Sequence, residues 1–136
     1  SGAKGCSHEW WHKFNEKKDN EQLKAHVHMK MGEVAYFLKL LAGPEAREAN
    51  GKTILENSLF TISTESGDAR HNDSKRELSG VFHAITSAAG RFKTGRILDL
   101  KAEAIDVYNT MLTSIGAKRR LGDAKRKVNL VNQIRA

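Results

Sequence analysis

The sequence is poor in several features that mark whole classes of protein. Its 136 residues contain one cysteine, Cys6, and one proline, Pro44. A single cysteine excludes an internal disulfide framework and a four-cysteine zinc site. No apolar run approaches the ~20 residues that span a bilayer, so no transmembrane segment is predicted. The length fits one modest domain, and the 39% of hydrophobic residues is sufficient for a folded core.

Positive charge is abundant only at the C-terminal end. Residues 117–136 supply +6 of the net +7, because they hold seven Lys or Arg and only Asp123 as an acid. The remaining chain is nearly balanced, which excludes a uniformly basic nucleic-acid domain. No aromatic residue follows Tyr108, so a base-stacking platform for nucleic acid is not expected either. A basic run of this kind can bind polyanions or contact a membrane surface; it consists of Lys118, Arg119, Arg120, Lys125, Arg126 and Lys127.

Apolar periodicity predicts a mixed order of helices and strands. A three-to-four spacing of apolar residues predicts helices over residues 20–41 and 103–115. Short β-branched runs predict strands over 59–64 and 81–87, and a third short strand is expected over 96–100. This order of elements is typical of an α/β fold.

The same pattern divides the chain into three parts. Residues 1–19 form an irregular segment rich in His and Trp, residues 20–116 form the α/β core, and residues 117–136 form a basic tail. Apolar residues spaced by three predict that part of this tail packs as a helix with its charges outward: Val128, Val131 and Ile134.

The stretch HEWWH near the N-terminus matches the H-E-x-x-H pattern of zinc metalloproteases. On a helix, His8 and His12 would lie one turn apart, and Glu9 could activate a zinc-bound water. The longer metzincin pattern is not met, because Asn15 and Lys18 stand where it needs Gly and His. We therefore favour a chance match and keep the metalloprotease as a minor alternative.

A carboxylate and a histidine follow the first predicted strand. Glu65 comes directly after the strand, and His71 comes six residues later. Loops at the carboxyl ends of strands often collect metal ligands in α/β proteins. A salt bridge or cap within the loop explains the same spacing, so both interpretations stay open. His83, inside the second predicted strand, is expected to be a hydrogen-bonded structural histidine.

Four motifs in chain order resemble a known family. They are residues 26–41 ending AYFLKLL, GKTILENSL at 51–59, TESGD at 64–68 with His71, and SAAGRFKTGR at 87–96. This series is similar to the C-terminal third of a large uncharacterised family of secreted bacterial proteins related to the sulfatase and alkaline-phosphatase-like superfamily. The resemblance covers most of this chain. In that family, glycine is common at the positions of Thr86 and Ala89.

The resemblance implies a metal site and an incomplete sheet. In such folds the metal ligands lie at the carboxyl ends of parallel strands. The family's acidic-and-histidine motif matches Glu65 and His71, and an earlier histidine matches His8, which makes these three the implied ligands of a divalent metal such as zinc. The resemblance also implies a periplasmic or extracellular protein. Its partial alkaline-phosphatase-like sheet would need a protein partner or a missing N-terminal segment, where the nucleophile and the first ligands would lie.

Two functions from different classes follow from these expectations. The first is a non-catalytic structural or interaction subunit of a larger assembly, because an incomplete sheet exposes edges and apolar surface that a partner would cover. The second is part of a metal-dependent hydrolase of the alkaline-phosphatase/sulfatase-like type. We expect the first, and whether the chain takes part in catalysis stays open.

Overall fold

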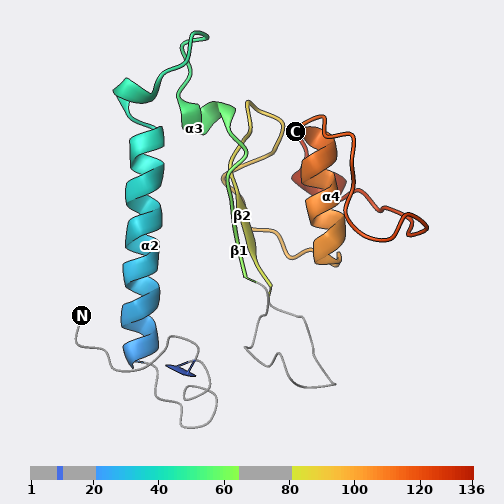
Figure 1. Ribbon diagram of the computed structural model, residues 1–136, viewed down its shortest axis with the longest axis horizontal. Helices are drawn as coiled ribbons and strands as arrows, with labels where there is room; N and C mark the ends of the chain where they lie inside the picture. The colour runs from blue at the N-terminus through green and yellow to red at the C-terminus, as the bar shows by residue number, and fades with distance from the viewer. Residues whose placement is uncertain (1–8, 11–20, 65–80) are drawn as a thin grey trace.

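A computed structural model describes residues 9–10, 21–64 and 81–136. Its elements follow the order helix, short helices, hairpin strands and helix (Figure 1). They are α2 (Glu21–Leu41), η1 (Pro44–Ala46), α3 (Ile54–Asn57), β1 (Thr61–Ser63), β2 (His83–Ile85), α4 (Ala104–Ser114) and η2 (Asn132–Ile134). None of the helices in these ranges combines the length and the apolar character that crossing a bilayer requires.

Helix α2 confirms the first predicted helix. Glu21 lies in its first turn and Lys39 in its last, where each charge suits the adjacent end of the helix dipole. The helix ends because Pro44 cannot continue it. The amide of Gly43 instead donates a tight-turn hydrogen bond to the carbonyl of Leu40 at 3.2 Å.

The sheet is a two-stranded antiparallel hairpin. Ile62 lies opposite Ala84, and Ser63 lies opposite His83. Both strands are shorter than predicted. At the end away from residues 65–80, the amide of Phe60 donates to the hydroxyl of Thr86 at 2.7 Å instead of to a backbone carbonyl. The extended stretch at 96–100 forms no strand in the described part of the chain, since it has no partner there. The described fold is therefore a small α/β arrangement. Its antiparallel pair differs from the parallel strands that an alkaline-phosphatase-like sheet implies.

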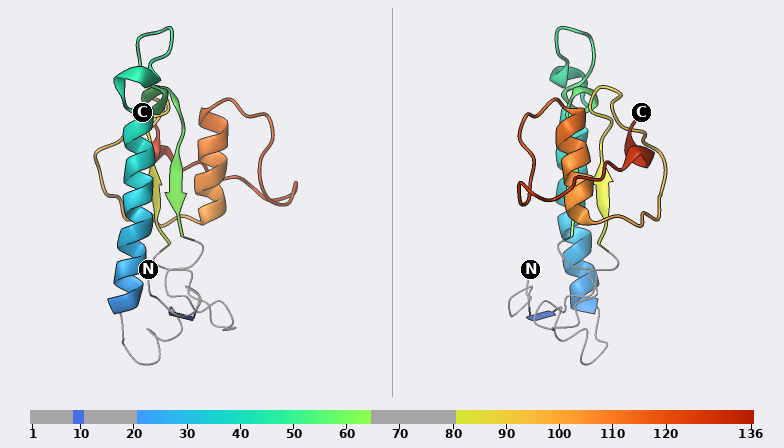
Figure 2. Two further views of the ribbon diagram at one scale, coloured as in Figure 1. Left: turned by 60° about the vertical axis from the view of Figure 1, so that its left-hand side comes forward. Right: turned by 90° about the vertical axis from the view of Figure 1, so that its right-hand side faces the viewer.

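The hairpin lies between the two long helices (Figures 1 and 2). Successive strand residues face opposite sides of a sheet. On one side the ring of Phe60 packs against Phe37 of α2, with 5.5 Å between centroids. On the other side Ser63 and His83 meet Tyr108 of α4. The strands thus form the middle of three layers.

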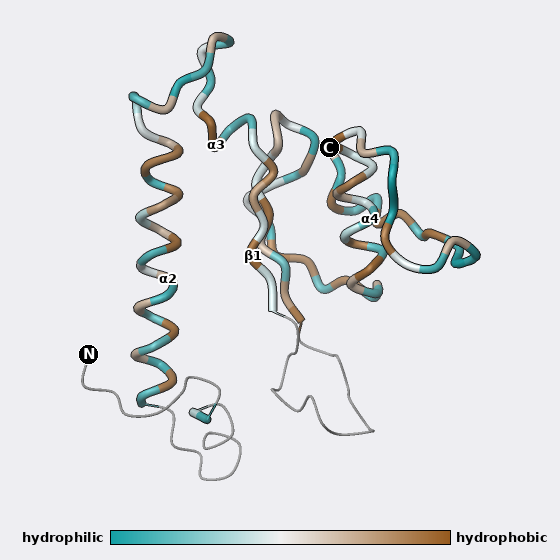
Figure 3. The backbone as a smooth tube through the Cα atoms, in the orientation of Figure 1, coloured by the Kyte–Doolittle hydropathy of each residue, from teal (hydrophilic) through white to brown (hydrophobic). Residues whose placement is uncertain are grey.

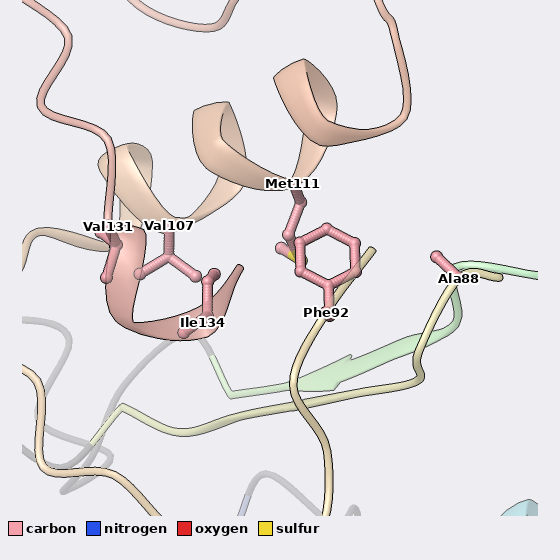
Figure 4. Packing of buried hydrophobic residues seen from close by; sticks show 6 residues of the cluster. All are labelled: Ala88, Phe92, Val107, Met111, Val131 and Ile134. Carbon is pink, nitrogen blue, oxygen red and sulfur yellow. The ribbon is translucent and has the colours of Figure 1, made fainter. Parts of the chain in front are cut away.

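The hydrophobic cluster of the described residues lies on the α4 side of the sheet, while Trp10 and Leu23 are buried apart from it. Phe92, from the segment after β2, packs among residues of α4 and of the C-terminal end (Figure 4). The buried cluster consists of Ala88, Phe92, Val107, Met111, Val131 and Ile134. The predicted tail packing is confirmed in part: Val131 and Ile134 are buried, but they flank and end a single 3₁₀ turn rather than a longer helix.

Buried polar side chains of α4 hold the chain that follows it. Asn109, which is 1% exposed, donates to the carbonyl of Leu121 at 3.1 Å and accepts from its amide at 2.8 Å. The Thr110 hydroxyl accepts from the amide of Val131 at 2.9 Å. Buried polar groups are costly unless they are paired, so these bonds fix the C-terminal segment against the helix.

Asp106 provides a third attachment. Its carboxylate accepts from Nη2 of Arg126 at 3.1 Å and from the amide of Asn129 at 3.3 Å. Burial raises the pKa of this carboxyl, but the Asn129 and Arg126 bonds together outweigh burial and leave the pKa below its usual value. Asp106 therefore stays ionised, and it binds Arg126, a cation of the segment predicted as a basic tail with its charges outward.

The turn after β2 contains backbone in a left-handed conformation. Ala88 and Ala89 have φ of 47° and 58°, and Gly90 has φ of 86°. Only glycine adopts such angles without a steric penalty. The amide of Ala89 donates to the carbonyl of Glu56 at 2.7 Å, which helps to hold the turn. Ala89 thus occupies a conformation suited to glycine.

Replacing Asn109 with Ala removes both bonds to Leu121 and leaves two backbone groups unpaired. We expect the free energy of unfolding to fall by about 2 kcal/mol, measured by urea denaturation at neutral pH. Gln133→Ala changes an exposed side chain with no hydrogen bond among the described residues, and should stay within about 0.5 kcal/mol of the wild type. Equal losses in the two variants would contradict the role of Asn109.

Replacing Ala89 with Gly relieves the left-handed strain at an exposed position. We expect the free energy of unfolding to rise by about 0.5–1 kcal/mol, because the relief exceeds the added entropy of the unfolded chain. The same change at Ala102, which is exposed and has no positive φ, should lower it by a similar amount. A loss of stability in Ala89→Gly would show that the turn is unstrained.

Candidate functional site

The predicted metal ligands lie outside the described residues. His8, Glu65 and His71 belong to the ranges 1–8 and 65–80. Within residues 9–10, 21–64 and 81–136, no group of three or more His, Cys, Asp or Glu side chains could hold a metal ion. The metal site therefore stays a prediction. The strand ends at Ser63 and His83 are close in sequence to the range 65–80 that holds two of the predicted ligands.

Ser63, His83 and Tyr108 form a small polar cluster at that end of the hairpin. The strand register places Ser63 directly opposite His83 on the face that meets α4. The Ser63 hydroxyl and the Tyr108 hydroxyl are 3.0 Å apart, within hydrogen-bond distance. The Tyr108 ring meets the His83 imidazole edge-on, with 5.0 Å between centroids and 89° between the planes. Side chains from three elements thus converge where residues 65–80 leave the sheet.

The prediction that His83 is hydrogen-bonded is not met among the described residues. Both imidazole nitrogens are buried, and neither has a hydrogen-bond partner in the ranges 9–10, 21–64 and 81–136. Burial lowers the pKa of this histidine, because removing the imidazole from water disfavours its charged form. The ring is held instead by its edge-on contact with Tyr108, so its role here is packing by a neutral imidazole.

The cluster assembles no nucleophile–base pair. A serine nucleophile needs a base within hydrogen-bond reach of its hydroxyl. Ser63 is paired with Tyr108, and His83 bonds to neither of them. The His83 imidazole, uncharged at neutral pH, can still accept a proton or a hydrogen bond. Sequence reasoning missed the cluster because only the strand register brings Ser63 and His83 together, and Tyr108 reads as an apolar position of its helix.

Helix α2 presents a second candidate site. Leu23 is the one buried residue among the 21 of this helix. Its outer face carries Met29, Tyr36 and Leu40, whose exposed fractions are 51%, 61% and 53%. Apolar positions continue along the whole length of α2 (Figure 3). Met31 and Phe37 are exposed as well, at 45% and 44%, so apolar side chains are exposed on more than one side of α2. Three of them, Met29, Tyr36 and Leu40, share one face, and a row of this kind is typical of a contact surface.

The outer face has the spacing of a helix–helix seam. Met29, Glu33, Tyr36 and Leu40 are separated by four, three and four residues, so they lie in one stripe. We call these four residues the α2 stripe. Glu33 is its one charged member and would need a cation or a hydrogen-bond donor opposite it. The half-buried side chains Val34 and Leu38 lie elsewhere on the helix, so the stripe is separate from the side that faces the sheet.

Of the two described residues of the HEWWH motif, Trp10 packs against α2. Trp10 is buried, and its ring meets His26 of α2 edge-on with centroids 5.0 Å apart. Glu9 is exposed. His8 and His12 lie outside the described residues, so the metalloprotease alternative stays a prediction.

Replacing His83 with Phe keeps the aromatic contact and removes two unpaired nitrogens. At pH 7.5 we expect equal stability or a gain of up to about 1 kcal/mol in the free energy of unfolding. Because the pKa of folded His83 lies below 6.5, the unfolded wild type takes up the proton first as the pH falls. The wild type should therefore lose stability from pH 6.5 downward, and the variant should lack that part of the loss. Urea denaturation at pH 7.5, 6.0 and 5.0 measures both effects, and His28→Phe on an exposed position is the control. A variant clearly less stable at pH 7.5 would contradict the unpaired state.

Comparison of this chain with protein-family models, with curated proteins and with solved structures finds no match.

Proposed function

We propose that this chain is a non-catalytic structural or interaction subunit of a larger assembly, and that it docks through the α2 stripe. The observation that carries the proposal is the exposure of Met29, Tyr36 and Leu40 on one face of a long helix. A partner that covers this face would remove the apolar surface from water. Burying each of these side chains fully is worth roughly 1.5–3 kcal/mol, and about half of that is still to be gained.

The sparse packing of α2 against the other described residues supports the same role. An isolated helix is only marginally stable in water, and most helical stability in proteins comes from packing. The described core lies on the other side of the sheet, around Phe92 and α4. On its own side, α2 has the ring contacts Phe37–Phe60 and Trp10–His26. A partner on the α2 stripe would give this helix a second packed face.

The stripe also defines what fits it. Its seam spacing suits an amphipathic helix laid alongside α2, with apolar side chains packing between Tyr36 and Leu40. Glu33 selects a partner with Arg or Lys at the facing position, because a carboxylate left unpaired in the contact would be costly. Lys30 and Lys39 are exposed on the same helix and favour acidic residues at the edge of the contact.

The metal-dependent hydrolase alternative has less support from the described residues. It rests on His8, Glu65 and His71, which lie outside them. Within them, the pairing of Ser63 with Tyr108 leaves His83 with no nucleophile to activate. The docking role is therefore the function that the geometry supports best.

A photo-crosslinking residue at Tyr36 tests the docking role in cells that naturally produce the chain. We expect one discrete protein adduct from position 36, because the side chain would lie inside the contact. The same crosslinker at Lys101, which is exposed beyond the sheet near α4, is the matched control and should give no such adduct.

Leu40→Glu should abolish the adduct from position 36 while the far-UV circular dichroism stays unchanged. A wild-type chain that remains monomeric in its native extract and gives no adduct from position 36 would overturn the proposal.

A further inference from the structure

The segment after α4 is a loop that hydrogen bonds hold against the helix. Residues 117–130, which we call the basic loop, run out to the side of the molecule as the orange-red trace (Figures 1 and 2). Three side chains of α4 attach it: Asn109 bonds to Leu121, Asp106 to Arg126 and Asn129, and Thr110 to the adjoining Val131. At Gly122, with φ of 92°, an added Cβ would lie 2.7 Å from Cδ1 of Ile105. The base of the loop therefore packs directly on the helix.

Part of the loop's charge is used in this attachment. Arg126 forms ion pairs with Glu103 and Asp106, each at 3.1 Å. The guanidinium of Arg120 donates to the carbonyl of Ala124. Asp123, the one acid of the loop, accepts from the amide of Lys125 at 2.8 Å and so stabilises the turn. These groups shape the loop.

Four cations of the loop are left for a partner. Lys118, Arg119, Lys125 and Lys127 are exposed, and their side chains form no hydrogen bond or ion pair within the described ranges. Because the loop is already held in place, bringing these charges to a partner costs less ordering than it would on a disordered tail. The geometry points to an electrostatic contact surface.

Apolar side chains on the same stretch indicate the kind of partner. Leu121 is 49% exposed, and Ile115 and Leu130 on either side are also exposed. A surface that mixes exposed cations with exposed aliphatic side chains suits the headgroup region of an anionic bilayer, where charge and apolar burial act together. Nucleic acid would reward the cations alone, and no aromatic residue of the loop could stack on bases.

We infer that the basic loop binds the surface of membranes that contain anionic lipid. Lys118, Arg119, Lys125 and Lys127 would contact lipid phosphates, and Leu121 would enter the headgroup region. This contact is peripheral, and it does not depend on the docking role of α2, which uses the other side of the sheet.

Sedimentation of the full chain with vesicles tests the inference. Vesicles of zwitterionic lipid alone are compared with vesicles that contain 30% anionic lipid. We expect binding only to the anionic vesicles, weakening steeply as salt is raised. Changing all four free cations of the loop to Gln should lower the partition coefficient by about 100-fold or more, and Leu121→Ser by roughly 3- to 10-fold.

The matched control changes four exposed lysines elsewhere to Gln, so that the net charge falls equally: Lys30, Lys39, Lys52 and Lys93. It should retain most of the binding. Circular dichroism checks that each variant folds, and the double variant Lys118→Glu/Arg119→Glu repeats the test with fewer changes.

Three results would overturn the inference. The first is no binding of the wild type to anionic vesicles at 50 mM salt. The second is an equal loss in the loop variant and the control, which would indicate net charge alone. The third is an unchanged affinity in Leu121→Ser together with tighter binding of a duplex DNA oligomer, which would assign the loop to nucleic acid.

Discussion

The described fold depends on the hydrogen bonds that α4 makes to the backbone after it. Asn109 and Thr110 are almost completely buried and are polar, so their pairing with Leu121 and Val131 is a requirement of their burial as well as a contact. This pairing brings the C-terminal segment back across the helix, where Val131 and Ile134 close the cluster around Phe92. Without these hydrogen bonds, the highly charged C-terminal segment would not be held where Val131 and Ile134 can pack in the core.

The attachment also makes the two sides of the sheet unequal. On the α4 side, the hairpin is covered by a closed cluster, and the charge of Arg126 is neutralised by Glu103 and Asp106. On the α2 side, the described contacts to the sheet are led by the pair Phe37–Phe60. Among the described residues, α2 is thus contacted by the sheet on one side, and the α2 stripe lies on another. The proposed partner of α2 would cover that second side.

The sequence predicts the elements that depend on local pattern and fails where the outcome depends on distant partners. Both long helices follow from apolar periodicity, and their ends agree with the structure within one residue. The stretch at 96–100 has the composition of a strand but no neighbouring strand in the described chain, so composition alone misleads. Asp106, Asn109 and Thr110 resemble a solvated helix face in sequence, and only the return of residues 121–131 buries them. The position of His83 inside a strand predicts a hydrogen-bonded histidine, whereas its contact among the described residues is the edge-on ring of Tyr108. The predicted ligands His8, Glu65 and His71 lie outside the described residues.

The arrangement of charge and apolar surface would allow the two proposed contacts to form at the same time. Helix α2 and the basic loop lie on opposite sides of the hairpin (Figure 1). A partner on α2 would bind through apolar packing, which salt hardly weakens, whereas the loop would bind through exposed cations, which salt screens. The two surfaces therefore respond to different conditions, and neither needs the other to be occupied. Most of the net positive charge of the chain lies in this loop. Of its six basic side chains, Arg120 and Arg126 form bonds within the described structure, and the other four are exposed.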